Sequence, residues 1–232
     1  MKHNDLVVRW LGQRAYPEVW RAMQHFTTSR TPDTRDEIWL LEHPPVYTVG
    51  VRGSGGENGN DLPTEIHGIP VLRTDRGGLI TYHGPGQLIA YTLIDLARKK
   101  ISVRDLVSAL ENATIALLRQ YGLVAAARND APGVYVQHAK IASLGLRVRK
   151  FRSYHGLSLN VNLDLTPFHH IDPCGFRNLA VTRLADLGVA VEVHEIAVPL
   201  LGCLMEALNS GQVHANLQHL PNQERQHHEQ SA

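Results

Sequence analysis

The segment from Ser153 to Leu165 restricts the possible folds more than any other part of the chain. Its apolar members are Leu157, Leu159, Val161 and Leu163, and they alternate with Ser158, Asn160, Asn162 and Asp164. Because successive side chains of a strand point to opposite faces of a sheet, this alternation is typical of a β-strand with one apolar face. The chain is therefore expected to build a sheet that carries a core on that face.

Two segments have the spacing of amphipathic helices. Over 102–121, apolar residues recur every three or four positions, Ser102 and Asp105 have the form of a capping box, and Gly122 provides a stop. Over 16–26 the same spacing follows Pro17, a residue that the first turn of a helix tolerates. Helices are also expected at 178–187 and 199–208.

Strands outnumber helices and occur in mixed order along the chain. We expect them at 6–10, 37–42, 46–49, 69–73, 88–96 and 189–193, with a strand pair or a bent strand over 133–148. This order favours an α+β class, with a mostly antiparallel mixed sheet flanked by helices in a single domain over 1–208. Five glycines make 50–60 a flexible loop, and the polar residues 209–232 are expected to be a disordered tail.

Composition excludes several classes of protein. The 232 residues carry 23 Lys and Arg against 22 Asp and Glu, and this net charge of +1 argues against a dedicated nucleic-acid binder. The longest uncharged run, 79–94, is broken by Gly84, Pro85 and Gly86 and is too short to span a bilayer. The N-terminus does not read as a signal peptide. We therefore expect a cytoplasmic protein with no membrane or nucleic-acid partner.

The two cysteines, Cys174 and Cys203, are too few for a disulfide framework and differ in context. Cys174 stands between a proline and a glycine, in a tight turn that suits a nucleophile with a cation nearby. Cys203 lies on an apolar helix face and is expected to be a core thiol. His169 and His170 precede Cys174 without the spacing of metal ligands, so we expect no metal site.

The glycine-rich segment 76–87 is the best candidate for a binding site. Its four glycines allow a backbone to approach a ligand closely, and Arg76, Tyr82 and His83 favour a site over a plain hairpin. It matches neither the P-loop nor the Rossmann fingerprint. Lys140 precedes an apolar strand, and from spacing alone a solvated turn lysine is a better interpretation than a lysine inside a pocket.

Five motifs occur together along the chain, at 42–48, 76–87, Lys140 with 143–145, 155–160 and 173–175. In combination they resemble the octanoyltransferases of lipoate biosynthesis, and the resemblance extends over about 6–208. The resemblance implies a biotin/lipoate protein ligase-like domain without a cofactor. It implies Cys174 as the acyl-thioester nucleophile and Lys140 as the residue that lowers its pKa. The implied substrate-binding residues are Arg76, Gly77, Gly78, Leu79, Ile80, Thr81, Tyr82, His83, Ser143, Leu144, Gly145, Gly156, Leu157 and Ser158.

The resemblance also implies the substrates and partners. The donor would be octanoyl-acyl carrier protein. The acceptors would be lysines of the lipoyl domains of 2-oxoacid dehydrogenase complexes and of the glycine cleavage H protein, and the enzyme would be a monomer. An apolar slot for the eight-carbon chain is expected among Leu79, Leu144, Leu146, Leu157 and Leu159. Two basic clusters, 98–100 and 147–152, stand out, and the second would dock an acidic partner unless it is only a solvated face.

Two other functions remain open. An ATP-dependent lipoate or biotin ligase on the same fold would need an adenylation site and no cysteine nucleophile. A catalytically silent fatty-acyl or carrier-binding module would tolerate the loss of Cys174 and Lys140. The Pro173–Gly175 motif favours the transferase.

Overall fold

The computed structural model describes residues 5–53, 62–128, 130–172, 179–209 and 213–217. Its elements, in chain order, are β1 (Leu6–Gln13), α1 (Tyr16–Ser29), β2 (Asp36–Glu42), β3 (Val46–Val49), β4 (Glu65–Ile66), β5 (Ile69–Arg73), β6 (Ile80–His83), β7 (Gln87–Leu93), α2 (Leu96–Lys99), α3 (Val103–Gln120), β8 (Ala125–Ala127), β9 (Gly133–Val136), β10 (Ala139–Arg149), β11 (Arg152–Asn160), α4 (Val193–Ala207) and β12 (Val213–Leu217). Short 3-10 turns cover Thr166–His170 and Ala185–Leu187.

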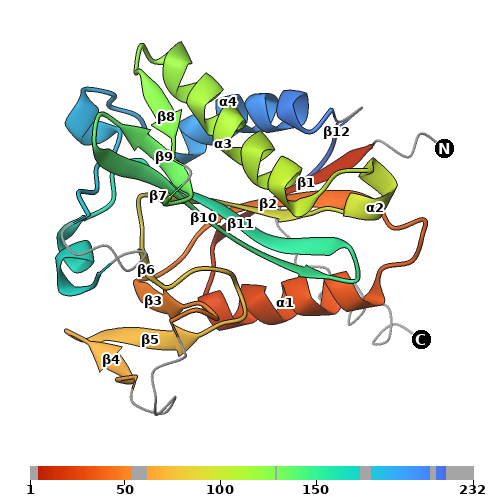
Figure 1. Ribbon diagram of the computed structural model, residues 1–232, viewed down its shortest axis with the longest axis horizontal. Helices are drawn as coiled ribbons and strands as arrows, with labels where there is room; N and C mark the ends of the chain where they lie inside the picture. Colours follow the sequence, from red (N-terminus) through yellow and green to blue (C-terminus); the bar gives the residue numbers. More distant parts are fainter. Residues whose placement is uncertain (1–4, 54–61, 129, 173–178, 210–212, 218–232) are drawn as a thin grey trace.

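An eight-stranded sheet in the order β12-β1-β2-β7-β11-β10-β9-β8 forms the centre of the molecule. Helices α3 and α4 cover one face and α1 covers the other, while a four-stranded sheet, β4-β5-β3-β6, lies beside them (Figure 1). In the large sheet only β12–β1 and β1–β2 are parallel among the described pairings. The expectation of an α+β domain with a mostly antiparallel mixed sheet is confirmed.

The central strands are buried on both faces, so they carry two apolar stripes rather than one. On β7, Leu88 and Ala90 join the core under α3 and α4, whereas Ile89, Tyr91 and Leu93 join the core under α1. The opposite faces of successive residues produce this division. A strand with both faces covered is close to continuously apolar, as β7 is from Leu88 onward.

The alternating segment forms β11, which confirms the predicted strand as far as Asn160. Leu157 and Leu159 enter the core under α3 and α4. Ser158 and Asn160 face the other way, but they too are buried, because the neighbouring layer covers that face. The chain then leaves the sheet, and Leu163 packs with Tyr47 in a third, smaller core.

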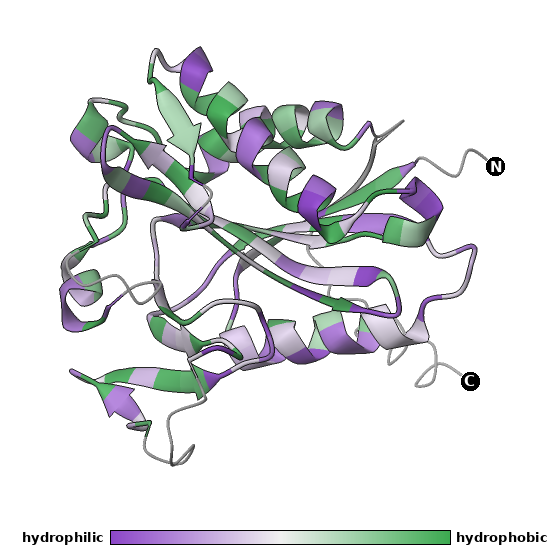
Figure 2. Cartoon of the chain, viewed as in Figure 1, coloured by the Kyte–Doolittle hydropathy of each residue, from purple (hydrophilic) through white to green (hydrophobic). Residues whose placement is uncertain are grey.

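Helix α3 begins as the sequence predicts. The Ser102 side chain accepts a hydrogen bond from the Asp105 amide, and the Asp105 carboxylate accepts one from the Ser102 amide. Helix α4 is largely apolar whereas α1 mixes polar and apolar positions (Figure 2). The difference follows from the sheet face that each helix covers and from the packing of α3 against α4.

Two of the predicted elements between 88 and 208 are wrong, and two more, the strand at 88–96 and the helix at 199–208, have different ends. The predicted helix at 178–187 is, from 179 onward, an extended segment with one 3-10 turn, because its backbone bonds the edge of β10 at Lys140. The predicted strand at 189–193 is absent, and α4 begins at Val193, ahead of the expected 199, after a capping box of Glu192 and Glu195. Strand β7 ends at Leu93, since Asp95 caps the short helix α2.

The expected disordered tail also needs correction where the structure describes it. Residues 213–217 form β12, which pairs in parallel with β1 from Leu6↔Val213 to Trp10↔Leu217. The sequence there alternates apolar and polar residues. An open sheet edge on β1 offers unpaired backbone groups, which such a segment can satisfy.

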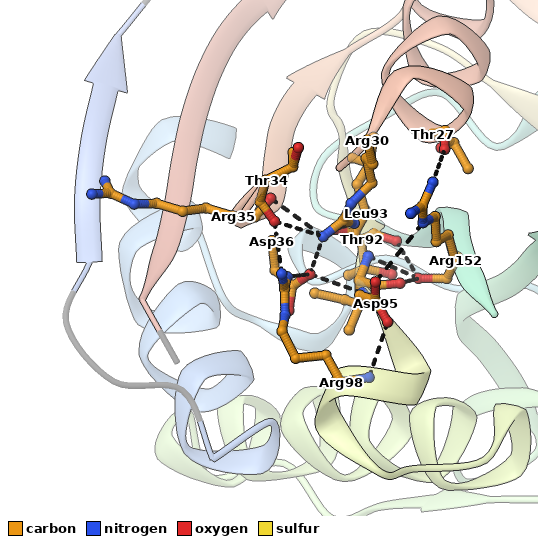
Figure 3. A network of polar contacts seen from close by, with 12 residues as sticks. Thr27, Arg30, Thr34, Arg35, Asp36, Thr92, Leu93, Asp95, Arg98 and Arg152 are labelled. Carbon is orange, nitrogen blue, oxygen red and sulfur yellow. Dashed lines mark hydrogen bonds and ion pairs between the residues drawn. The ribbon is translucent and has the colours of Figure 1, made fainter. Parts of the chain in front are cut away.

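A network of charges joins the end of α1 and the short helix α2 to strands β2 and β11 of the large sheet (Figure 3). Buried Asp36 accepts hydrogen bonds from Arg30 and from Arg98, the latter at 2.6 Å. Its Oδ1 also accepts from the Asp95 amide at 2.8 Å. The Asp95 carboxylate lies 3.8 Å from Arg152 on β11. One buried carboxylate thus ties three separate segments together.

Candidate functional site

A pocket of about 510 Å³ of empty space, partly open to solvent, lies where the segment 76–83 crosses β7, β10 and β11. The residues around it are Tyr16, Arg76, Gly78, Leu79, Ile80, Thr81, His83, Ile89, Tyr91, Ser143, Leu144, Gly145, His155, Gly156, Leu157 and Ser158. Its lining is largely apolar with a few convergent polar groups, which is the composition of sites that bind small ligands.

The structure brings nearly all the predicted substrate-binding residues to this pocket. Only Gly77 and Tyr82 do not line it. The Gly77 amide donates to the Leu146 carbonyl at 2.9 Å and so fastens the loop to β10. The Tyr82 ring packs against Tyr47 and Phe168 in the smaller core. That the pocket binds substrate remains a prediction.

Of the five leucines expected to form an acyl slot, Leu79, Leu144 and Leu157 line the pocket. Leu144 and Leu157 also belong to the core under α3 and α4, to which Leu146 and Leu159 contribute without lining the pocket. Alternation along β10 and β11 does not by itself separate slot from core. The crossing loop decides which of these residues reaches the cavity.

Two glycines allow backbone segments to approach closely at the pocket, Gly145 the loop at 76–77 and Gly156 the neighbouring strand β7. Gly145 and Gly156 face each other across β10 and β11. A Cβ atom on Gly145 would stand 3.2 Å from Cδ of Arg76, and one on Gly156 would overlap the Ala90 carbonyl. Larger residues would push apart the walls that form the pocket.

Arg76 organises the loop from inside. Its guanidinium donates to the carbonyls of Gly77 and Leu79, each at 2.8 Å, and to the carbonyl and hydroxyl of Thr48 on β3. A buried cation needs such acceptors. Arg76 therefore shapes the pocket wall through the backbone of the loop.

A relay of hydrogen bonds runs inward from Arg76 to His83. The Thr48 hydroxyl accepts from Arg76, so its own proton is free for Nε2 of His83 at 3.3 Å. Nδ1 of His83 then donates to the side-chain amide oxygen (Oε1) of Gln87 at 2.7 Å. Burial, with nearby His43, lowers the pKa of His83 to about 3, so the ring is neutral at pH 7.

His43 lies behind the pocket wall and is missing from the predicted site. Its Nδ1 donates to the Arg14 carbonyl at 2.7 Å, which leaves Nε2 to accept from the Tyr91 hydroxyl at 2.8 Å. Burial lowers the pKa of His43 to about 4. The pocket is thus lined and backed by neutral imidazole and phenol rings, among which Tyr16 stacks on His83 at 5.9 Å.

Asp75 anchors another wall. It accepts hydrogen bonds from His155 at 2.9 Å, from Trp20 at 2.8 Å and from the Tyr154 hydroxyl. Burial opposes ionisation, but these hydrogen bonds outweigh it and hold the pKa of Asp75 well below its usual value. Consecutive strand residues such as Tyr154 and His155 normally face opposite ways. Here the rings of both residues point to the Asp75 carboxylate, and His155 has a left-handed φ of 62°.

Lys140 is buried, with 2% of its surface exposed, so the solvated turn that spacing favoured is wrong. Its Nζ lies 5.4 Å from the centre of the Tyr135 ring, and it does not line the pocket. Cys174 lies outside the described residues. The chain that follows it returns to Lys140: the Lys140 amide donates to Ala180, and the Thr182 amide donates to Lys140.

Cys203 is a core thiol, as predicted. It packs under α3 and α4, accepts a hydrogen bond from Gln120, and burial raises its pKa. In the described part of the chain, no group of three or more His, Cys, Asp or Glu side chains is arranged to hold a metal ion. No helix in that part is long and apolar enough to cross a membrane.

Sequence reasoning missed Tyr16, His43, Asp75, Ile89, Tyr91 and His155. Tyr16 and Tyr91 looked like ordinary residues of apolar faces, and Asp75 looked like part of a turn. His43 and His155 stand inside the family-like motifs, and that position was the one available signal.

The chain is similar to known proteins over most of its length. The family described as the lipoyl protein ligase A/B catalytic domain matches residues 15–204. An octanoyltransferase of Methylococcus capsulatus is 57% identical over 209 residues, 90% of this chain and 99% of that protein. One of Alkalilimnicola ehrlichii is 52% identical over 205 residues, 88% of this chain and 93% of that protein.

The fold has solved counterparts. A crystal structure of lipoate-protein ligase A bound with ATP superposes with a TM-score of 0.76 at 16% identity, covering 97% of this chain and 93% of that chain. An identity this low shows the fold alone, whereas the sequence relatives match nearly end to end at more than half of their positions. The chain therefore belongs to the lipoyl protein ligase A/B catalytic domain family and, within it, to the octanoyltransferases, which are acyltransferases.

Proposed function

We propose that this enzyme moves an octanoyl group from octanoyl-acyl carrier protein to a specific lysine of a lipoyl domain, through a thioester on Cys174. The acceptors would be lipoyl domains of 2-oxoacid dehydrogenase complexes and the glycine cleavage H protein. We place the enzyme in the cytoplasm as a monomer. The near-complete match to octanoyltransferases carries the proposal, supported by the pocket that the family-like motifs assemble.

The transfer would take two steps. In the first, the Cys174 thiolate attacks the donor carbonyl, the carbon–sulfur bond to the carrier breaks, and the carrier thiolate leaves and takes up a proton. In the second, the neutral amine of the target lysine attacks the Cys174 thioester, an amide forms, and the Cys174 thiolate leaves. Splitting the transfer in this way replaces one difficult reaction step by two easier steps.

Lys140 would serve both steps. An ammonium near Cys174 favours the thiolate, and once the thiolate becomes a neutral thioester, Lys140 loses its proton more easily and can take the proton of the target amine. Two observations support this role: the side chain is buried, and the segment following Cys174 pairs with the backbone of Lys140.

The pocket would hold the acyl chain. Leu79, Ile80, Ile89, Leu144 and Leu157 supply apolar wall, and burying eight carbons could contribute on the order of 5 kcal/mol. The neutral state of His83 and His43 keeps charge away from this chain. The octanoyl chain is aliphatic, and apolar side chains with neutral rings suit it, while the guanidinium of Arg76 is occupied by the loop carbonyls.

Intact-mass spectrometry tests the proposal. The protein is incubated with octanoyl-acyl carrier protein without ATP, and a hydroxylamine-labile octanoyl adduct is expected. Cys174→Ser should abolish the adduct, while Cys203→Ala, which removes the buried thiol, should retain it in the folded protein. An adduct that persists in Cys174→Ser, or no adduct on active protein with a competent donor, contradicts the proposal.

The same measurement distinguishes an ATP-dependent ligase. That enzyme would acylate a lipoyl domain from free octanoate and ATP, and Cys174→Ser would keep the activity. A silent acyl-binding module would acylate nothing under either condition.

A further inference from the structure

The tip of the β10–β11 hairpin carries an aromatic side chain that folding does not explain. Arg149 pairs with Arg152, and the two residues between them, Lys150 and Phe151, have φ of 50° and 61°. Positive φ at both central residues is the mark of a type I′ turn, which favours Asn followed by Gly. The Phe151 ring is 70% exposed, so it gains little from packing.

Phe151 is thus unfavourable in two ways. A bulky residue in the left-handed region is an outlier, and an aromatic ring in water loses the benefit of burial. The backbone there is nonetheless fixed, because the Phe151 carbonyl accepts from the Leu96 amide at 2.8 Å. A strained residue held in place with its ring in solvent points to binding rather than to stability.

Basic residues flank Phe151 in the chain. Arg147, Arg149 and Lys150 are exposed, and Arg149 and Lys150 form no ion pair with any residue that the structure describes. Leu146 and Val148 pack against the core under α3 and α4, so Arg147 and Arg149 point to the opposite face of β10. That face also carries Gly145, which lines the pocket.

The other basic cluster, 98–100, does not form such a surface. Arg98 bonds Asp36 in the buried network, and Lys99 donates to the Leu208 carbonyl at 3.2 Å. Two of its three charges are therefore used inside the molecule. The hairpin remains as the basic surface that leads to the pocket.

We propose that the hairpin tip, Arg147 to Arg152 with Phe151 at its centre, docks the carrier protein that delivers the acyl group, through an acidic patch with an apolar centre. An aromatic anchor among arginines is the composition of a binding hot spot. The cations would steer an acidic partner and fix its orientation. This assignment rests on the proposed function, which supplies a carrier-bound thioester as the donor.

The position of the tip distinguishes the donor from the acceptor. Phe151 precedes Gly156, at the pocket, by five residues, or about 17 Å of strand. A carrier that holds its thioester at the end of a long flexible arm can dock at this distance and still reach the pocket. A target lysine reaches only the length of its own side chain, so its domain must sit at the pocket mouth.

Steady-state kinetics of Phe151→Gly test the proposal. Glycine suits the left-handed φ, so the midpoint of thermal unfolding should stay level or rise by about 2 °C. The KM for octanoyl-acyl carrier protein should rise about 5-fold or more, with kcat and the KM for the lipoyl domain unchanged. The matched control is Val124→Gly, which removes another exposed apolar side chain, 89% exposed, from the segment before β8.

Charge reversal tests the electrostatic part. Arg149→Glu should raise the KM for the carrier further and weaken its dependence on salt. An unchanged carrier KM in both variants overturns the docking assignment while leaving adduct formation, and thus the proposed function, intact. It is also overturned if the KM for the lipoyl domain rises instead, if Phe151→Gly lowers the unfolding midpoint, or if the tip binds vesicles of anionic phospholipid and not the carrier.

Discussion

Gly133 leaves room for the side chain of Lys140. A Cβ atom on Gly133 would stand 2.5 Å from Cε of Lys140 and 2.6 Å from the Ala142 carbonyl oxygen. The φ of Gly133 is 143°, a value that other residues rarely adopt. The Gly133 amide donates to the buried carboxylate of Glu111 at 3.0 Å, which fixes this backbone to α3. The glycine thus determines where the lysine stem can pass.

Gly133→Ala should therefore displace the ammonium of Lys140. We expect octanoyl-adduct formation on Cys174 to slow about 10-fold or more, because the thiolate would lose part of its stabilisation. The pH at which Cys174 reacts with an alkylating reagent should rise, and this readout distinguishes misplacement of Lys140 from simple loss of stability. A variant with the same alkylation profile as the parent would show that Lys140 does not act on Cys174 from this position.

Gly202→Ala is expected to have the opposite effect on stability. Gly202 lies exposed within α4, and a Cβ there meets nothing within 4 Å. Alanine in a helix interior is more favourable than glycine, so the free energy of unfolding should increase by about 0.5–1 kcal/mol. Chemical denaturation measures this change. Transfer activity should be unaltered, which also makes this variant the glycine-to-alanine control for Gly133→Ala.

Stability should fall as the pH drops below about 6.5. Burial lowers the pKa of His43 to about 4 and of His83 to about 3, and it also lowers the pKa of His155. The unfolded chain, with histidines near 6.5, then binds more protons than the folded one. The histidine contribution is complete above 6.5 and is lost at lower pH, on the order of 1 kcal/mol per pH unit for each buried ring.

Calorimetry in buffers of different ionisation enthalpy measures the protons taken up on unfolding. At pH 5.5 we expect about two or more from these histidines, and at pH 8 almost none. Proton uptake near zero at pH 5.5 would mean that the histidine rings are already charged in the folded protein. That result would contradict neutral rings at the pocket.

The charge network of Figure 3 should be a major contributor to stability. Asp36→Ala leaves the buried guanidinium of Arg30 without its nearest carboxylate, and removing one partner of a buried ion pair costs about 3–5 kcal/mol. Urea denaturation of the two proteins measures the loss. The exposed pair of Arg128 and Asp130 is the matched control, and Asp130→Ala should leave the midpoint unchanged. Equal effects of the two substitutions would refute the special role of Asp36.

Local patterns determined much of the fold. The capping box of Ser102 and Asp105, the alternation through Leu157 and Leu159, and the glycines of 76–86 act over a few residues, and the structure shows each where the sequence predicts it. The sequence at 179–182 predicts a helix, but the segment is extended because its backbone partners lie on β10, far away in sequence. Residues 213–217 likewise become a strand by pairing with β1.

The site shows the same division. The sequence alone marked Arg76, Lys140 and the motifs around them, because unusual residues among glycines and small side chains are visible in one dimension. Only the tertiary structure decided that Lys140 is buried, that Leu146 serves the core rather than the pocket, and that Asp75 joins Trp20 to His155. Burial and hydrogen bonding between distant segments depend on how layers pack, and no local pattern records that packing.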